Sequence, residues 1–528
     1  MDSVSGVTSF APPGSRGRAR VSQAREEATP PCIHAMMPPM STPEPIREEA
    51  EHAGPAAMAG RFAGPLIGGV LVALTHPAAL GAGGLEAPAA WTLGLLAWMA
   101  IWWMTHAAEL AVTSLLPVIL LPMLGVQPFR EVASNYADQV IFLFAGGATL
   151  GWALERHGLS ARFVGAMLSV AGRSPAMVVA ALLVAAACVS AFVSNLATTA
   201  AMLPLAAGIA ARARALPGTE PAAAERARRN LGIAALLAIA YGSSIGGAAT
   251  IVGSPPNPIA AEYLAERGEP IDFAGWLAVG VPAAALMSMA AIAVLLRMLP
   301  VRGIELVPDE SARDTPWTWQ ARATLAVFAA TVLTWTTGRA WPEGWRPAEL
   351  TDGAVAITAA ALLMLIPARD GTHARVVPWR AVRELPWGVF ILFGGGLAIA
   401  DAMQDTGLSG AIGRSLSGLG GAHPVVALAA LVGAMAFASE VASNTALTAT
   451  AVPIVGALAP TIGLPVRTAV LAATFGASYA FMLPVGTPPN ALVFATGRVP
   501  QPVMMRVGLV LNLVAIALLT AVAWMLMR

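Results

Sequence analysis

The sequence predicts an all-α polytopic membrane protein with about 11 transmembrane helices, two re-entrant hairpins and an inverted repeat. Three observations support this fold class. Of the 528 residues, 57% are hydrophobic and only 12% are charged. Uncharged apolar runs of about 20 residues, the length that an α-helix needs to cross a bilayer, recur along the chain. Two apolar blocks are longer than one crossing requires, and the short polar motifs inside them occur twice.

The first 60 residues differ in composition from the rest of the chain. They are rich in Pro, carry several Arg residues, and contain neither a membrane-spanning apolar run nor the apolar core of a signal peptide. This composition predicts a disordered N-terminal tail over 1–60, or a start of translation assigned too early, with Met58 as the alternative start.

The apolar runs after this tail define the predicted crossings. Residues 61–134 supply N-terminal scaffold helices, 135–300 and 385–528 form two repeat units, and 301–384 hold the loop and helices that link them. The predicted crossings are, in order, about 64–82, 90–105, 109–125, 139–157, 231–252, 273–299, 321–338, 352–367, 386–403, 466–484 and 505–527.

Two apolar blocks of about 35 residues, 176–211 and 424–460, exceed the length of a straight crossing. Each block is therefore either one broken crossing with excess length or two half-helices that meet at a re-entrant tip. We favour a hairpin in both cases, because each block contains a Ser-Asn pair near its middle, which suits a tip. The pairs are Ser194-Asn195 and Ser443-Asn444.

The two blocks belong to an internal repeat. A shift of 249 positions aligns Asn195 with Asn444 and Pro204 with Pro453 without a gap, and it also aligns FAGGATLGWALERHGLS with FGGGLAIADAMQDTGLS. Further on, IVGSPPNPI matches PVGTPPNAL at a shift of 233. Duplicated units with broken hydrophobic segments in corresponding positions indicate a secondary transporter whose site lies at the repeat interface.

The basic loops predict the orientation of the repeat units. Loops 212–230 and 369–384 each carry several Arg residues, so the positive-inside rule places both in the cytoplasm. If the block 176–211 dips in and returns, four crossings separate the helix 139–157 from its repeat partner 386–403, and the units are inverted. If the block crosses, the units are parallel. We favour inversion, because it follows from the hairpin interpretation.

The repeated motifs supply groups that a cation and an anion need. The Ser-Asn pairs and the predicted helix breaks at 253–257 (GSPPN) and 486–490 (GTPPN) offer hydroxyl, amide and freed carbonyl oxygens, and their Pro residues interrupt the helices. Oxygen-rich sites without carboxylates suit a weakly held cation such as Na⁺. The helices that begin after each break present N–H groups and a positive dipole end, which favour an anion.

Composition disfavours several other function classes. The formal net charge is +1, so no global field recruits nucleic acid. The two Cys residues, Cys32 and Cys188, have no metal-ligand spacing, and the seven His residues are scattered. A membrane-embedded enzyme is therefore the least favoured alternative, and we expect no organic cofactor.

The motifs resemble those of a known family. SNLATTA and SNTALTA resemble the paired Ser-Asn-Thr signatures of the divalent anion:sodium symporter family, and GSPPN and GTPPN resemble its paired loops. The stretch ASYAFMLPVGTPPNALVF is similar to the sodium:sulfate/dicarboxylate symporter signature over its whole length, and the resemblance covers about 64–528. It implies a homodimer in the lipid bilayer of the inner (plasma) membrane, in which a transport domain moves against a scaffold domain by an elevator mechanism.

The resemblance also implies a function and a set of site residues. The function is Na⁺-coupled symport of a divalent anion, which would be a C4-dicarboxylate, a tricarboxylate or sulfate; a Na⁺-independent exchanger of the same fold is the alternative. One Na⁺ site would consist of Ser190, Ser194, Asn195 and Gly253, and its repeat counterpart of Ser439, Ala442, Asn444 and Gly486. The anion would be held by Asn195, Ser254, Ser443, Asn444, Thr445 and Thr487, with Pro255 and Pro488 shaping the loops.

Three residues stand out against this pattern. Leu196 stands where the first motif of the family has Thr, so an apolar side chain replaces one expected hydroxyl contact and the identity of the anion stays open. Glu440 and Asp401 are acids at membrane depth whose counterparts in the first half are Ala191 and Trp152. An intramembrane acid is a functional candidate by default.

Overall fold

The computed structural model describes residues 55–77, 85–307, 317–342, 347, 350–369, 371, 374–415 and 423–527. Of the tail predicted over 1–60, residues 1–54 lie outside this described part, and helix α1 already begins at Pro55. The regular structure of the described residues is helical except for one pair of three-residue strands, which agrees with the predicted class.

The helices before the first repeat unit pack through small residues. A Cβ built on Gly68 of α1 (Pro55–Thr75) would lie 2.6 Å from the carbonyl oxygen of Gly94 in α3 (Ala87–Thr105), so the two backbones approach closely. The shorter elements that follow are α4 (Leu110–Thr113), α5 (Leu116–Met123), α6 (Phe129–Ser134) and the 3-10 turn η3 (Asn135–Ala137).

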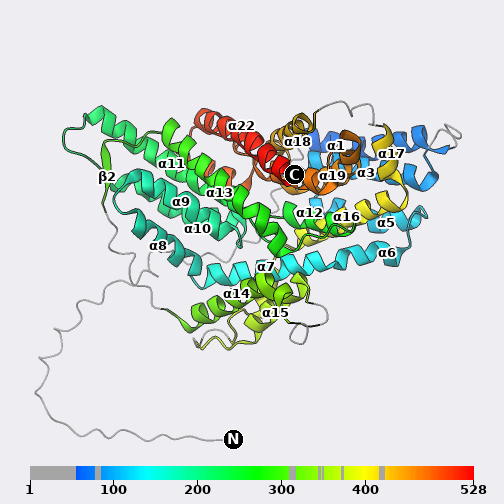
Figure 1. Cartoon of the computed structure of the whole chain (residues 1–528), viewed down its shortest axis with the longest axis horizontal. Helices are drawn as coiled ribbons and strands as arrows, with labels where there is room; N and C mark the ends of the chain where they lie inside the picture. Colours follow the sequence, from blue (N-terminus) through cyan, green and yellow to red (C-terminus); the bar gives the residue numbers. More distant parts are fainter. Residues whose placement is uncertain are drawn as a thin grey trace, which may run out of the picture. The chain divides into compact units, whose positions relative to one another are not determined.

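The first repeat unit starts with α7 and ends with a long apolar helix. Figure 1 shows α9, α10 and α11 side by side. Helix α9 begins at a Pro, and the Ser174 hydroxyl before it accepts a hydrogen bond from the backbone N–H of Met177. The elements are α7 (Gln139–Arg156), α8 (Leu159–Ala171), α9 (Pro175–Ser190), α10 (Asn195–Ile209), η4 (Ala210–Arg212), β1 (Ala213–Ala215), α11 (Pro221–Gly247), α12 (Pro256–Ala265), α13 (Phe273–Met298) and β2 (Ile304–Leu306).

The linking segment and the second repeat unit complete the chain. The linking elements are α14 (Trp319–Thr337), η6 (Gly338–Ala340), α15 (Asp352–Leu365) and η7 (Trp379–Glu384). The second unit repeats the order of the first with a shorter loop after its hairpin. Its elements are α16 (Trp387–Asp405), α17 (Leu408–Ser415), α18 (Pro424–Ser439), α19 (Asn444–Leu458), η9 (Ala459–Ile462), α20 (Val466–Ser478), α21 (Pro488–Ala495) and α22 (Gln501–Leu526).

Strand β2 holds both ends of the first hairpin on one side. It pairs antiparallel with β1, with Ala213 opposite Leu306. The backbone N–H of Leu306 donates to the Arg173 carbonyl at 3.0 Å, and that of Val307 donates to the Arg212 carbonyl at 3.1 Å. Arg173 precedes α9 and Arg212 follows α10, so the segment dips in and returns. The hairpin interpretation of 176–211 is confirmed.

Helix α22 contacts the bases of both hairpins, one at each of its ends. The Arg498 side chain, just before α22, donates to the Ala207 carbonyl in α10. Near the other end, the Trp524 ring lies 5.7 Å from the His423 ring, which directly precedes α18. Because α22 separates these two contacts along its length, the hairpins enter from opposite sides.

The first helices of the two units run antiparallel. The indole Nε1 of Trp152, near the end of α7, donates to Oε2 of Glu384, which lies just before α16, at 2.7 Å. At the other end, Nδ2 of Asn135, just before α7, lies 3.5 Å from Oδ2 of Asp401, near the end of α16. These two contacts confirm the inverted arrangement of the units.

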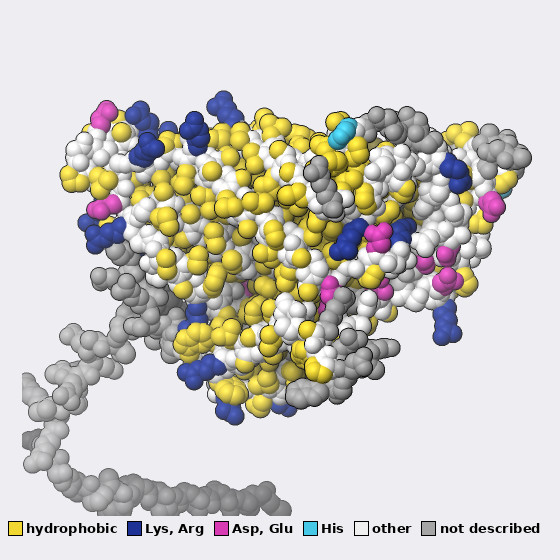
Figure 2. Space-filling view, viewed as in Figure 1, with side chains coloured by type: hydrophobic (Ala, Val, Ile, Leu, Met, Phe, Trp, Pro, Cys, Tyr) yellow, Lys and Arg dark blue, Asp and Glu magenta, His cyan; other side chains and the backbone are white. Residues whose placement is uncertain are grey.

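The helices have the length and composition of a membrane protein. Eight described helices are long and apolar enough to cross a bilayer, although one of them, α19 with η9, is half of the second hairpin. The remaining predicted crossings are α14, which has 19 residues but is less apolar than these eight, shorter helices such as α15, and helices broken in the middle. Figure 2 shows apolar side chains over most of the visible face, as a lipid environment requires.

Candidate cation and anion site

The two hairpin tips repeat the same side-chain contact. Ser190, at the end of α9, donates from Oγ to Oδ1 of Asn195 at 2.7 Å. In the second unit, Oγ of Ser439 lies 2.5 Å from Oδ1 of Asn444. Both serines are fully buried. The structure therefore brings together the Ser and Asn of each predicted Na⁺ site and directs their oxygens toward one another.

Each unit also contains a helix that unwinds next to its hairpin. Helix α11 ends at Gly247 and α12 begins at Pro256, while α20 ends at Ser478 and α21 begins at Pro488. The unwound segments are thus longer than the five-residue breaks predicted at 253–257 and 486–490. The Pro residues fix where the second helix begins, but close packing against the hairpin decides where the first one ends.

That packing is visible at the end of α11. A Cβ on Gly246 would lie 2.0 Å from the Ala187 carbonyl oxygen, and a Cβ on Gly247 would lie 2.3 Å from Oδ1 of Asn195. Only Gly allows α11 to approach the first hairpin this closely. The tip and the unwound segment therefore form one compact unit.

Two asparagines, which the sequence interpretation left out of the site, hold the unwound segments. Nδ2 of Asn257 donates to the carbonyl oxygens of Gly247 (2.8 Å) and Thr250 (2.7 Å). Both side chains of the pair, Asn257 and Asn490, are fully buried, and their Oδ1 atoms have no hydrogen-bond partner. Nδ2 of Asn490 donates to the carbonyls of Ala480 (3.2 Å) and Leu483 (3.1 Å). The duplicated Pro-Pro-Asn motif, which ends in these two residues, was the sequence signal that could have identified them.

The first predicted Na⁺ site is lined mainly by backbone carbonyls. A Cβ on Gly253 would lie 2.6 Å from the Gly247 oxygen and 3.0 Å from the Ala191 oxygen, and the Thr250 hydroxyl donates to that Ala191 oxygen. Gly253 thus joins the group formed by Ser190 and Asn195. Carbonyl and amide oxygens at such close range suit an alkali cation.

Ser194 has a different position from the other residues predicted for the first Na⁺ site. Its side chain is exposed, and Oγ accepts a hydrogen bond from the backbone N–H of Ala197 at 3.3 Å. The hydroxyl therefore serves as the N-cap of α10. The equivalent Ser443 makes no such cap bond with α19.

Glu440 organises the second unwound segment. Its carboxylate accepts backbone hydrogen bonds from Phe481 (2.7 Å), Met482 (2.9 Å) and Leu483 (2.8 Å). It also accepts from Nδ2 of Asn512 at 2.7 Å, and it is almost fully buried. These four hydrogen-bond donors, none of which is a basic side chain, compensate the carboxylate and lower the free-energy cost of burying its charge.

This carboxylate has no equivalent in the first unit. A Cβ on Gly486 would lie 2.9 Å from Oε2 of Glu440, so a negative charge stands beside the second predicted Na⁺ site. Ala191 occupies the matching position in the first unit and contributes only its carbonyl. Buried Ala442 and Gly486 lie in the same region as Ser439 and Asn444. The two halves are therefore similar in backbone but different in charge.

The residues predicted to hold the anion lie at the breaks and at the start of α19. Ser254 and Thr487 are buried, and Oγ1 of Thr487 accepts from the backbone N–H of Asn490 at 3.3 Å. Its own O–H can still donate to an anion. The other predicted residues are Pro255 at the start of α12, Pro488 at the start of α21, and the half-buried Ser443, Asn444 and Thr445.

Four helices begin at the tips and breaks. Helices α10, α12, α19 and α21 each present the positive end of a helix dipole there. Helices α10 and α19 also present backbone N–H groups of their first turn, whereas α12 and α21 begin at Pro residues, which have no N–H. Such ends stabilise negative charge without a basic side chain. Leu196 lies in the first turn of α10 and is 48% exposed, so its side chain is available to a bound anion.

Comparisons with known proteins agree with this arrangement. A family model described as "Citrate transporter" matches residues 100–476. The chain is 33% identical over 482 residues to the "Sodium-dependent dicarboxylate transporter SdcS" of Staphylococcus saprophyticus, which covers 89% of this chain and 91% of that protein. The protein of the same name from Staphylococcus aureus strain NCTC 8325 is 32% identical over 486 residues, with 89% and 92% covered.

A solved structure supports the fold alone. The YdaH transporter of Alcanivorax borkumensis, described as having an unusual topology, is similar with a TM-score of 0.56 at 14% sequence identity. The similarity covers 89% of this chain and 98% of that chain.

Proposed function

Because this chain belongs to the divalent anion:sodium symporter family, we propose that it is a secondary active transporter that moves a dicarboxylate across the membrane together with Na⁺. The observation that carries the proposal is the duplicated pairing of a Ser-Asn tip with an unwound helix. Both Staphylococcus relatives are named sodium-dependent dicarboxylate transporters. The matching family and relatives are transporters, so the chain is a multi-pass plasma-membrane protein and not an enzyme.

The proposed coupling follows from the charges at the site. Ser190, Asn195 and Gly253 would hold one Na⁺, and Ser439, Asn444 and Gly486 would hold another. A dianion at the start of α19 would then be balanced by these cations and by the helix dipoles, because no Arg lies in the tip segments. Binding of the anion without Na⁺ would leave uncompensated charge inside the membrane, which costs several kcal/mol.

We also propose an elevator movement of the hairpins and broken helices as one body. Contacts across the two units support this: the Tyr241 hydroxyl donates to the Phe481 carbonyl at 3.0 Å, and the Tyr263 hydroxyl donates to the Pro453 carbonyl at 3.4 Å. The first joins α11 to the second unwound segment, and the second joins α12 to α19. The fixed body would contain α1 and α3, and would form the interface of a homodimer.

Uptake into proteoliposomes tests the proposal. Labelled succinate, citrate and sulfate are offered with an inward Na⁺ gradient, and in a parallel sample choline replaces Na⁺. Uptake of succinate that needs Na⁺ is the expected result. Uptake that persists in choline and requires a dicarboxylate inside the vesicle would instead identify an exchanger of the same fold. Transport of none of the three anions would reject the proposed substrate class.

A further inference from the structure

Four exposed tryptophans lie at the ends of helices around the link between the repeat units. Trp317 precedes α14 and Trp319 begins it, whereas Trp379 lies in η7 and Trp387 begins α16. Their exposed fractions range from 40% for Trp319 to 74% for Trp379. Trp is enriched at the level of the lipid headgroups, because its ring is apolar and its N–H is polar. These side chains therefore indicate a membrane–water interface.

Arginines from two neighbouring segments stack on two of these rings. The guanidinium carbon of Arg162, in α8, lies 4.8 Å from the ring centroid of Trp317. That of Arg369, in the loop after α15, lies 4.1 Å from the ring centroid of Trp319. The indole Nε1 of Trp319 also donates to the Pro367 carbonyl at 2.9 Å. Helix α8, the start of α14 and the loop after α15 therefore share one surface.

The same loop continues into η7 and contacts the end of α7. Nε2 of His157, directly after α7, lies 3.1 Å from the Val376 carbonyl oxygen. Trp152, near the end of α7, donates to Glu384 at the end of η7. Because α8 begins two residues after His157, η7 and the stacked rings belong to one surface. We call it the Trp-Arg surface, and its residues are Trp317, Trp319, Trp379, Arg369, Arg380 and Arg383.

Two arginines of the Trp-Arg surface carry charge that no ion pair neutralises within the described part of the chain. Arg369 and Arg383 are exposed, and neither forms an ion pair with a described carboxylate. Glu384, next to Arg383, accepts the indole hydrogen of Trp152 instead. The planar fork of Arg donors matches the oxygens of a phosphate, and stacking on an indole orients the fork. The surface thus suits phosphate groups at the membrane boundary.

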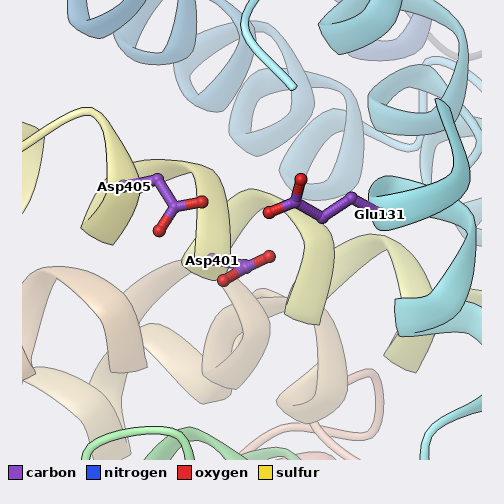
Figure 3. Close-up of side chains that lie close together, drawn as sticks. All are labelled: Glu131, Asp401 and Asp405. Carbon is purple, nitrogen blue, oxygen red and sulfur yellow. The ribbon is translucent and has the colours of Figure 1, made fainter. Parts of the chain in front are cut away.

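The other end of α16 has the opposite charge. With 19 residues, α16 spans about 28 Å, close to the thickness of the hydrocarbon core. Asp401 and Asp405 lie near its far end, and Figure 3 shows Glu131 of α6 reaching toward them. Glu266, in the loop after α12, interacts electrostatically with Asp401, and the exposed Glu269 follows in the same loop. These acids repel anionic headgroups, whereas the Trp-Arg surface attracts them.

We propose that the Trp-Arg surface binds the headgroups of acidic phospholipids in the cytoplasmic leaflet. The basic loop 369–384 places this surface on the cytoplasmic side. The headgroup of phosphatidylglycerol offers a phosphate without a cationic group, whereas the choline of a zwitterionic headgroup offsets the phosphate charge. The inference does not depend on the proposed function, because it uses no residue of the transport site.

Native mass spectrometry of the purified full-length protein tests the surface. The protein in detergent micelles is titrated with phosphatidylglycerol and, separately, with phosphatidylcholine of the same acyl chains. We expect phosphatidylglycerol to bind at least about tenfold more tightly, because each basic side chain near a charged headgroup contributes a factor of about five. Equal affinity for the two lipids would overturn the proposal.

Paired arginine variants assign the binding to this surface. Arg369→Gln/Arg383→Gln is expected to weaken phosphatidylglycerol binding at least about tenfold and to leave phosphatidylcholine binding unchanged. The matched control is Arg226→Gln/Arg229→Gln, which removes two exposed arginines from loop 212–230, the other basic loop on the same side. The affinity of this control should equal that of the wild type. An equal loss in both double variants would show that net charge selects the lipid, and would overturn the assignment to the Trp-Arg surface.

A single substitution keeps the test decisive if size-exclusion chromatography shows that the double variant is not folded. Arg383→Gln breaks no ion pair among the described residues, so we expect it to fold. Its affinity for phosphatidylglycerol should fall about fivefold. Unchanged affinity in this variant would overturn the proposal.

Discussion

Asn257 and Asn490 hold the two unwound segments in the same way. Each donates from Nδ2 to the carbonyl oxygens of the residues ten and seven positions before it. Each is fully buried, and in each the amide oxygen has no partner. The inverted units thus share a clamp that fixes the direction of carbonyls near both proposed Na⁺ sites.

Removing this clamp should strongly impair coupled transport. Asn257→Leu or Asn490→Leu keeps the volume but removes the side-chain donor from the carbonyl of Gly247 or Ala480, at a cost of about 1–3 kcal/mol, while the carbonyls of Thr250 and Leu483 keep a backbone N–H partner. We expect a lower Tm and at least about a tenfold loss of Na⁺-driven uptake. Asn230→Leu is the control, because it removes an exposed bond to the Pro300 carbonyl. Wild-type uptake in either clamp variant would contradict the role.

Leu196 should set the preference among anions. It aligns with Thr445 of the second unit, whose hydroxyl is predicted to contact the anion. Leu196→Thr adds a donor at an exposed tip position and should favour succinate over less polar anions, by about tenfold for one good hydrogen bond to a charged group. The reciprocal Thr445→Leu should lower uptake of all dicarboxylates. Competition of unlabelled anions against labelled succinate measures both effects, and an unchanged order in Leu196→Thr would exclude the residue as a determinant.

Replacing Glu440 should weaken the second unwound segment more than the first. In Glu440→Gln, an amide NH₂ replaces a carboxylate oxygen that accepts hydrogen bonds from backbone N–H groups, so a donor faces a donor. Each charged hydrogen bond that breaks lowers the free energy of unfolding by about 1.5–3 kcal/mol. We expect a lower Tm and a higher Na⁺ concentration for half-maximal uptake. Glu225→Gln, which breaks an exposed pair with Arg228, should change neither value appreciably. Equal behaviour of the two variants would show that Glu440 does not anchor the segment.

Glu266 should make the folded state less stable at alkaline pH. Its pKa is raised from 4.5 to about 8, so a proton binds the folded state more tightly than the unfolded chain. The resulting stabilisation is complete below about pH 4.5 and is lost as the pH rises through about 8. The Tm of the wild type should therefore fall more between pH 5.5 and 8.5 than that of Glu266→Gln. Glu269→Gln serves as control, and parallel curves for Glu266→Gln and the wild type would refute the assignment.

The sequence predicts the architecture well because its motifs are local and occur twice. The excess length of 176–211 leaves a broken crossing and a hairpin open, and the Ser-Asn pair near its middle favours the hairpin. The antiparallel contacts of α7 and α16 confirm the inverted units. The ends of the breaks could not be predicted, because α11 stops where Gly246 and Gly247 meet the first hairpin, which is a tertiary contact. The strand pair of Ala213–Ala215 was missed for a similar reason, since nothing in its residues favours a strand.

The predicted site residues are only partly accounted for by geometry. Ser190 with Asn195, and Ser439 with Asn444, come together as the repeat implies. Asp401 was a candidate, but its proximity to Gln127 was missed, because the two residues are 274 positions apart and share no motif. Their proximity depends on the packing of α16 against the segment just before α6.

The shorter loop after the second hairpin has a consequence for the history of the chain. The shift between the halves falls from 249 to 233 because the Arg-rich loop 212–230 has no counterpart between α19 and α20. A single ancestral unit without that loop would have had little reason to prefer either membrane orientation, and two copies inserted in opposite senses could assemble around one site. In the joined chain, a basic loop in one unit biases the membrane orientation of both units, because their relative orientation is fixed.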